Sequence, residues 1–273
     1  GRLLSEELTP EDWAGIIEAV AKVLDEGGTS GIIIAHGTDT LSFTASMLYW
    51  LFGDTKIPIV LAASVKSGDG ATNALQGAMK TVLQGKPGVF VNVDGKAYSP
   101  VNLKFEKVAP DGFSNWNLNK NIHTGNASLP EHTDKRSLKE ALEGILRSTF
   151  VVRIFPGMQG DSLIALMNWG VCHFILELYD TGTANLRETP FSLKKAFEYG
   201  RENGVSFFCT SQQEGIVDFS EYITSHELWK EGAIPMGGLT TESAFSRLVT
   251  ARLAGETNEE VTAIMEEADA RLG

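Results

Sequence analysis

Two cysteines are all that the 273 residues contain, and this scarcity excludes one class of protein. Two thiols are too few for the disulfide framework that stabilises small secreted domains. Cys172 and Cys209 both lie in apolar segments, so we expect them to be small core residues in a reducing compartment. The sequence also shows no cluster of metal-binding residues, and we expect neither a metal nor another cofactor.

Long hydrophobic runs and an excess of positive charge are missing as well. No apolar run approaches the length that spans a bilayer, and the first residues resemble neither a signal peptide nor a transit sequence. We therefore expect a cytoplasmic protein with no membrane partner. Lys and Arg number 23 against 35 Asp and Glu, which gives a net charge of -12. Such a surface repels phosphate backbones, so we expect no direct contact with nucleic acid.

The stretch Gly31–Thr40 organises the rest of the chain. An uncharged apolar run ends in the sequence His-Gly-Thr-Asp-Thr, and a segment rich in Leu, Met and aromatic residues follows it over 41–52. This pattern predicts a buried parallel strand, a tight turn and a helix. Ligands of open α/β sheets bind at such turns, which would place Thr38 and Asp39 in a functional crevice. The local pattern supports equally well that Thr38, Asp39 and Thr40 only cap the helix.

Strand, turn and helix recur along the chain, which predicts an α/β protein with parallel sheets and right-handed crossovers. Residues 126–139 are polar and rich in turn formers, which is typical of an exposed linker. We expect a larger N-terminal parallel-sheet domain over 1–125, a linker over 126–148 and a smaller C-terminal α/β domain over 149–273. The expected strands are 31–35, 58–63, 88–93, 150–155, 173–178 and 205–210. The expected helices are 10–26, 41–52, 70–84, 161–169, 191–203, 241–253 and one from 258 onward.

Between residues 94 and 126 the pattern changes to short alternating pieces. In the piece Val101–Phe105 the apolar residues alternate with Asn102 and Lys104, which predicts a short strand with Lys104 on its less apolar face. Taken alone, this pattern favours a surface lysine on an edge strand.

These motifs, in their order and spacing, resemble the bacterial-type (class 1) L-asparaginase family over nearly the whole chain. Each piece alone is a weak signal, but the ordered set is specific. The segments that carry the resemblance are Ser5-Glu6, Thr9-Pro10-Glu11-Asp12-Trp13, His36-Gly37-Thr38-Asp39-Thr40, Ile57–Leu61, Ser67–Asn73, Lys104 with Phe113–Asn117, Pro156–Met158 and Ile234–Thr240.

The resemblance implies an amidohydrolase that converts the side-chain amide of L-asparagine, or of glutamine, into the acid and ammonia. It implies a catalytic relay of Thr38, Asp39 and Lys104. A threonine hydroxyl needs a base beside it, and a lysine can serve when its amine is deprotonated. Asp39 would pair with the α-ammonium group of the substrate or hold Lys104 in position.

The resemblance also implies a set of substrate-binding residues ahead of and around this relay. Ser5 is expected to contact the α-carboxylate of the substrate and Glu6 its α-ammonium group. The same residues have a plain alternative interpretation as polar residues ahead of a helix. The substrate-binding residues expected from the resemblance are Ser5, Glu6, Gly37 and Ser64.

The chain departs from the family pattern in two places. Family members begin with a strand that carries a Thr-Gly-Gly-Thr-like motif and a nucleophilic Thr, and this sequence starts after that region. We expect an N-terminal segment or a separate chain to run beside Ile32–Ala35 and bring a second hydroxyl toward Thr38. The alternative is that Thr38 and Lys104 act alone on a bound water. The turn Ala62–Lys66 also differs from the family's, which alters the surroundings of the reacting oxygen.

Two other functions stay open at this point. The D subunit of the archaeal glutamyl-tRNA(Gln) amidotransferase, an ammonia-supplying glutaminase, has a similar entry segment, although the acidic charge argues against a tRNA-docking face on this chain. A degenerate relative that binds an amino acid without turnover is the third possibility. We also expect a homodimer or homotetramer in which the C-terminal domain of one subunit closes the site of another. Apolar residues expected to be exposed in loops support it: Phe113, Trp116, Phe219, Tyr222 and Trp229.

Overall fold

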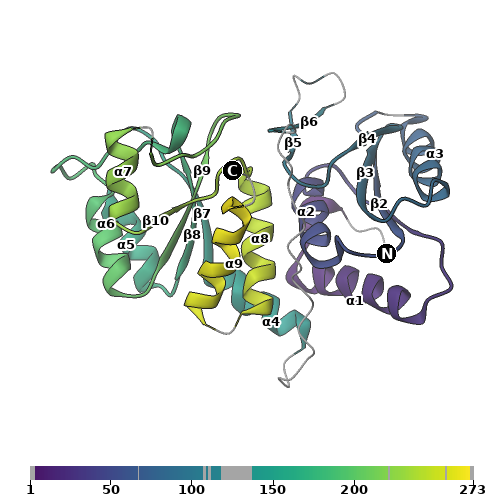
Figure 1. Cartoon of the computed structure of the whole chain (residues 1–273), viewed down its shortest axis with the longest axis horizontal. Helices are drawn as coiled ribbons and strands as arrows, with labels where there is room; N and C mark the ends of the chain where they lie inside the picture. The colour runs from purple at the N-terminus through teal and green to yellow at the C-terminus, as the bar shows by residue number, and fades with distance from the viewer. Residues whose placement is uncertain are drawn as a thin grey trace. The chain divides into compact units, whose positions relative to one another are not determined.

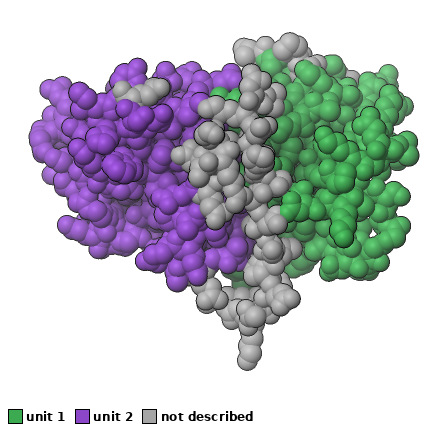
Figure 2. All heavy atoms as spheres, in the orientation of Figure 1, with its two compact units in different colours: residues 1–118, 124–142 green, residues 119–123, 143–273 purple. Residues whose placement is uncertain are grey.

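A computed structural model of the protein describes residues 4–66, 68–106, 109, 112–117, 137–220, 222–255 and 257–270, without the side chains of 267–270. The chain forms two compact units of nearly equal length (Figures 1 and 2). Unit 1 contains residues 1–118 and 124–142, and unit 2 contains 119–123 and 143–273.

Unit 1 is built on a four-stranded sheet in the order β1-β2-β3-β4. The first three strands are parallel and lie where the sequence predicts them, whereas β4 was not predicted and runs antiparallel to β3, so the sheet is mixed. β2 is buried along its whole length, while β1 is an outer strand of this sheet and is only half-buried. The strands are β1 (Ile32–Ala35), β2 (Pro58–Ala63), β3 (Gly88–Val93) and β4 (Lys96–Tyr98).

Helices cover both faces of this sheet (Figure 1). The face that contains Val60 and Ala62 packs on Ala74 and Ala78 of α3. Helix α2 packs on β2 and β3 from the other side. The predicted capping box of α1 is present, with Asp12 N donating to the Thr9 hydroxyl. The helices of unit 1 are η1 (Ser5–Glu7), α1 (Pro10–Glu26), α2 (Leu41–Phe52) and α3 (Gly70–Leu83).

A two-stranded hairpin of β5 (Leu103–Phe105) and β6 (Phe113–Asn115) carries Lys104, which pairs with Ser114. The predicted strand over 101–105 is thus shorter than expected. Asn102 has a left-handed backbone with φ 57° and is buried, so it does not share the more exposed face of Lys104. The left-handed backbone at Asn102 interrupts the strand alternation, which explains why the pattern was misleading there.

The expected linker over 126–148 is only partly described. Residues 126–136 lie outside the described residues, and helix α4 (Leu138–Arg147) occupies most of the remainder. Leu138, Leu142 and Ile145, at helical spacing, are buried, so this part of the expected linker is packed structure.

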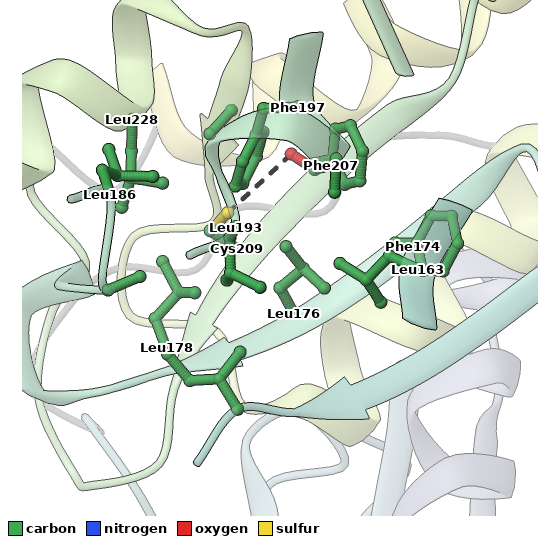
Figure 3. Packing of buried hydrophobic residues seen from close by; sticks show 14 of the residues in the cluster. Leu163, Phe174, Leu176, Leu178, Leu186, Leu193, Phe197, Phe207, Cys209 and Leu228 are labelled. Carbon is green, nitrogen blue, oxygen red and sulfur yellow. Dashed lines mark hydrogen bonds between the residues drawn. The ribbon is translucent and has the colours of Figure 1, made fainter. Parts of the chain in front are cut away.

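Unit 2 is built on a second four-stranded sheet, in the order β10-β9-β8-β7, with every strand pair parallel. Figure 3 shows its core: apolar side chains of β8 and β9 pack against Phe197 of α6 and against Leu193, the N-cap residue of that helix. The strands are β7 (Thr149–Arg153), β8 (His173–Leu178), β9 (Ser206–Ser211) and β10 (Ala233–Pro235). The helices are α5 (Gly160–Asn168), η2 (Asp180–Gly182), α6 (Lys194–Glu202), α7 (Ile223–Lys230), α8 (Thr241–Ala254) and α9 (Asn258–Ala270).

Cys209 belongs to this core, where burial raises the pKa of its thiol. Cys172 is half-buried, and neither cysteine forms a disulfide. Phe113 and Phe219, which we expected to be exposed, are buried core residues, whereas Tyr222 and Trp229 are more than half exposed. Within the described residues, no helix is long and apolar enough to cross a membrane, and no cluster of His, Cys, Asp or Glu is arranged to hold a metal.

Candidate active site

The candidate site lies at the carboxyl edge of the sheet of unit 1. Ala35 pairs with Ala62, and Ala63 pairs with Val93, so β1, β2 and β3 end level with one another. Backbone hydrogen bonds continue past the strand ends, from His36 N to the Ala62 oxygen at 2.9 Å and from Asp94 N to the Ala63 oxygen at 3.1 Å. The loops that follow the three strands therefore begin at one edge, which is where open α/β sheets bind ligands.

Gly37 and Ser5 are in direct contact at this edge. A Cβ on Gly37 would lie 2.4 Å from Ser5 Oγ, so a larger residue has no room there. The Thr40 hydroxyl donates to the Ser5 backbone oxygen at 2.8 Å, and Ser5 is buried. The structure thus brings together two predicted substrate-binding residues, Ser5 and Gly37, from segments separated by the whole of α1. Glu6, the third, is exposed on η1.

Thr38 and Asp39 form the turn between β1 and α2. Thr40 is the N-cap residue of α2, but no side chain accepts a hydrogen bond from the first turn of this helix. Thr40 thus occupies the N-cap position, but none of the three side chains caps the helix through a hydrogen bond. Within the described residues, the Thr38 hydroxyl and the Asp39 carboxylate make no hydrogen bond or ion pair, and Asp39 is exposed. Both groups are thus available to a ligand.

Ser64 follows β2 and is held by the residue that follows β3. Its hydroxyl contacts Asp94 Oδ1 at 2.6 Å and the Lys66 oxygen at 2.9 Å. Asp94 has a left-handed backbone with φ 51°. A Cβ on Gly70 would lie 2.1 Å from Ser64 Oγ, so α3 begins in close contact with this pair. Sequence reasoning missed Asp94, although a lone acid at a strand end is a signal that was present.

Lys104 extends from the β5–β6 hairpin over the ring of Trp116, with its Nζ 5.1 Å from the ring centroid. This cation–π contact places the amine against an aromatic face. The hairpin is joined to the segment that precedes β5, because Asn115 Nδ2 donates to the Ser99 and Val101 oxygens. Within the described residues, no hydrogen bond or ion pair joins Lys104 to Thr38 or Asp39, so the predicted relay stays a prediction.

His36 forms a polar network beneath the turn that sequence reasoning did not assign. Its Nδ1 lies 2.7 Å from the Gly37 oxygen and its Nε2 lies 3.0 Å from the Thr44 hydroxyl. Trp13 Nε1 donates to the same hydroxyl at 3.1 Å. Burial lowers the pKa of His36, and the hydrogen bond to Gly37 opposes that shift. The network joins α1, α2 and the end of β1.

Sequence comparison relates the first half of the chain to a known family. Residues 2–132 match a family described as asparaginase, N-terminal. Two relatives, each named as the D subunit of glutamyl-tRNA(Gln) amidotransferase, are similar over most of the chain. The one from Aeropyrum pernix is 28% identical over 90% of this chain, and the one from Metallosphaera sedula is 29% identical over 96%. The matches span 61% and 63% of those relatives' own lengths, less than two thirds.

Structural comparison shows that the chain has the fold of several L-asparaginases. The thermostable L-asparaginase from Thermococcus kodakarensis matches with a TM-score of 0.79 and 24% identity, over 97% of this chain and 82% of the other. L-asparaginase I from Vibrio cholerae matches with a TM-score of 0.75 and 21% identity, over 97% and 82%. A protein titled probable cytoplasmic L-asparaginase, from Campylobacter jejuni, matches with a TM-score of 0.73 and 21% identity, over 97% and 83%. At these identities the likeness establishes the fold.

Proposed function

Because this chain belongs to the asparaginase family, we propose that it is an amidohydrolase that releases ammonia from the side-chain amide of L-asparagine. One observation carries the proposal: the Thr38 hydroxyl and the Asp39 carboxylate stand at the carboxyl edge of a parallel sheet without an internal partner among the described residues. A hydroxyl that serves neither the core nor a helix cap is available for reaction.

In the proposed reaction the Thr38 hydroxyl gives its proton to the neutral amine of Lys104 and acts on the amide carbon, directly or through a water. The carbon–nitrogen bond breaks, and the nitrogen takes the proton from the Lys104 ammonium and leaves as ammonia. On the direct route a water then hydrolyses the ester left on Thr38, which releases the acid and restores the hydroxyl, whereas on the water route the attacking water supplies the new oxygen of the acid. Asp39 balances the α-ammonium charge of the substrate. Ser5, packed on Gly37, supports binding of the α-carboxylate.

The remaining substrate contacts follow the same edge. Glu6 is exposed one residue from Ser5, where its carboxylate is suited to the α-ammonium group. Ser64 lines the end of β2. A second nucleophilic threonine, on an N-terminal segment or a separate chain beside β1, stays part of the proposal. The half-buried apolar side chains of β1 support it, since an outer strand of this composition favours further pairing.

The second candidate is an ammonia-supplying glutaminase subunit of a tRNA amidotransferase. The observation that favours it is the name shared by the relatives from Aeropyrum pernix and Metallosphaera sedula. At 28–29% identity, sequence does not separate a free asparaginase from such a subunit. In either case we propose a cytoplasmic homo-oligomer.

Ammonia release by the full-length gene product, measured with asparagine and glutamine in parallel, tests the proposal. A free asparaginase turns over asparagine without a partner protein. Preference for glutamine, or turnover only with further subunits, supports the amidotransferase role. Calorimetric binding of either amino acid with no ammonia released indicates the non-catalytic relative and overturns the proposal.

A further inference from the structure

The hydrogen bonds around His36 determine which of its nitrogens carries a proton. A carbonyl oxygen can only accept, so the 2.7 Å contact with the Gly37 oxygen requires a hydrogen on Nδ1. In the neutral ring Nε2 is then an acceptor, and the Thr44 hydroxyl at 3.0 Å is its donor. That hydroxyl in turn accepts the Trp13 indole N–H.

These bonds run in one direction. The Trp13 N–H donates to Thr44, the Thr44 hydroxyl donates to His36 Nε2, and His36 Nδ1–H donates to the Gly37 carbonyl. With the ring neutral and protonated at Nδ1, every polar atom in the series has a partner, whereas a proton on Nε2 would make Thr44 accept twice and leave its hydroxyl hydrogen without His36 as an acceptor. Thr44 is fully buried, so an unpartnered hydroxyl there would be costly.

The bond to Gly37 has a consequence for the next residue. The peptide bond between Gly37 and Thr38 is planar and trans, so its carbonyl and its N–H point in opposite directions. Drawing the Gly37 carbonyl toward the imidazole therefore turns the Thr38 N–H away from it. Gly37 has no side chain to resist a rotation of this peptide, and Ser5 packs where a Cβ of residue 37 would lie.

We infer that His36 is a positioning residue, which is held as the Nδ1–H tautomer by Thr44 and Trp13 and thereby fixes the Gly37–Thr38 peptide that carries the candidate nucleophile. The functional half of this inference rests on the proposed function, whereas the tautomer and the peptide orientation do not. His36 itself does not touch the reacting atoms.

Two substitutions of His36 test the two hydrogen bonds of its imidazole separately. In His36→Asn the side-chain amide nitrogen takes the place of Nδ1 and can still donate to the Gly37 oxygen. In His36→Gln the terminal amide reaches the position of Nε2 and can contact Thr44 but not Gly37. Each variant keeps one of the two hydrogen bonds, so we expect similar losses of melting temperature, which controls for a purely structural role.

We expect the two variants to differ in the conformation of the Gly37–Thr38 peptide and in kcat. His36→Asn keeps the backbone amide shift of Thr38 and most of kcat, while His36→Gln moves that shift and lowers kcat on the order of 10-fold or more, as misplaced reacting groups do. Equal kcat in two variants of equal stability would overturn the positioning role.

Nitrogen-15 NMR of the wild-type imidazole provides a readout that needs no activity. We expect His36 to show a protonated Nδ1 and an unprotonated Nε2 at neutral pH. A spectrum with the proton on Nε2 would overturn the inference even in an active enzyme. If the protein releases no ammonia, the proposed function fails, but the tautomer and the Thr38 amide shifts of the two variants still decide the structural claim.

Discussion

At the scale of single residues, we assign Asp39 to function and not to the stability of the fold. Its carboxylate is exposed and makes no hydrogen bond or ion pair among the described residues, so the fold does not depend on its charge. Its proposed partner is the α-ammonium group of the substrate, and an amide cannot balance that charge.

We therefore expect the free energy of unfolding of Asp39→Asn to lie within about 0.5 kcal/mol of the wild-type value, as is usual for surface substitutions. The same variant should lose most of its kcat/KM for asparagine. Urea denaturation and initial-rate kinetics on one preparation give both values. Thr72→Ser, on the exposed side of α3, is a control variant and should change neither the free energy of unfolding nor kcat/KM. Unchanged affinity for asparagine in Asp39→Asn would remove Asp39 from the site.

The site could be predicted from the sequence only in part. The strand–turn–helix pattern places Thr38 and Asp39 at a sheet edge, because a hydrophobic run and a polar break are local features. The network of Trp13, His36 and Thr44 was missed, because its members come from three elements and a periodic pattern reports only which face of an element is buried.

At the scale of elements, two glycines in helices have opposite surroundings. Gly15 in α1 is exposed, and a Cβ there would meet nothing within 4 Å. Gly77 in α3 faces β3, where a Cβ would lie 2.4 Å from Asn92 Oδ1. Asn92 is buried and accepts a hydrogen bond from Gly95 N, so it cannot easily move.

The same substitution should therefore have opposite effects at the two positions. Gly15→Ala should raise the free energy of unfolding by about 1 kcal/mol through helix propensity. Gly77→Ala should lower it by about 1–3 kcal/mol, because the added methyl group forces α3 away from the sheet. Chemical denaturation of both variants measures the pair. Equal stabilisation by both would show that α3 does not pack on β3 as described.

Most elements could be predicted, and the failures share a cause. The bounds of β2, β3 and β8 agree with the prediction, because each is a short, mainly apolar segment that stands out from its neighbours in the sequence. The strands β4, β6 and β10 have three residues each, too few to show a period, and they form by pairing with neighbours. Helix α4 does have buried residues at helical spacing, and the polar segment before it obscured them.

At the scale of the whole molecule, one buried histidine links folding to pH. His173 begins β8, is fully buried, and neither ring nitrogen has a hydrogen-bond partner among the described residues. Burial, with a smaller contribution from the charge of Arg252, lowers its pKa to about 4. The ring of Phe208 lies 6.4 Å from it, centroid to centroid. The folded protein therefore holds this ring neutral.

An unfolded chain protonates His173 near its ordinary pKa of 6.5. Stability from this group is complete above pH 6.5 and is lost as pH falls toward 4, by at most about 3 kcal/mol. His173→Phe should flatten this part of the pH dependence in urea titrations, whereas the matched change His226→Phe, at an exposed position, should leave it intact. An unchanged slope in His173→Phe would contradict this assignment.

Exposed apolar side chains in unit 2 support self-association. Trp169 and Ile223 are each 82% exposed and Trp229 is 58% exposed, and aromatic side chains are enriched at protein–protein interfaces. We expect sedimentation equilibrium of the full-length protein at micromolar concentration to give at least twice the mass of its chain. A monomer mass in a catalytically active sample would contradict the proposed homo-oligomer.

Above all, we propose that a lysine on the β5–β6 hairpin, Lys104, acts as the base of an amidohydrolase. Lys104→Met keeps the apolar stem and removes the amine, and Lys96→Met is its matched control. Lys96 is another strand lysine of unit 1, with its Nζ 5.0 Å from the centroid of the Tyr98 ring. The decisive measurement is the initial rate of ammonia release from asparagine by wild type and both variants. We expect a loss of about 100-fold or more in Lys104→Met, with Lys96→Met close to wild type. A Lys104→Met enzyme within about tenfold of wild type, or equal losses in both variants, would contradict it.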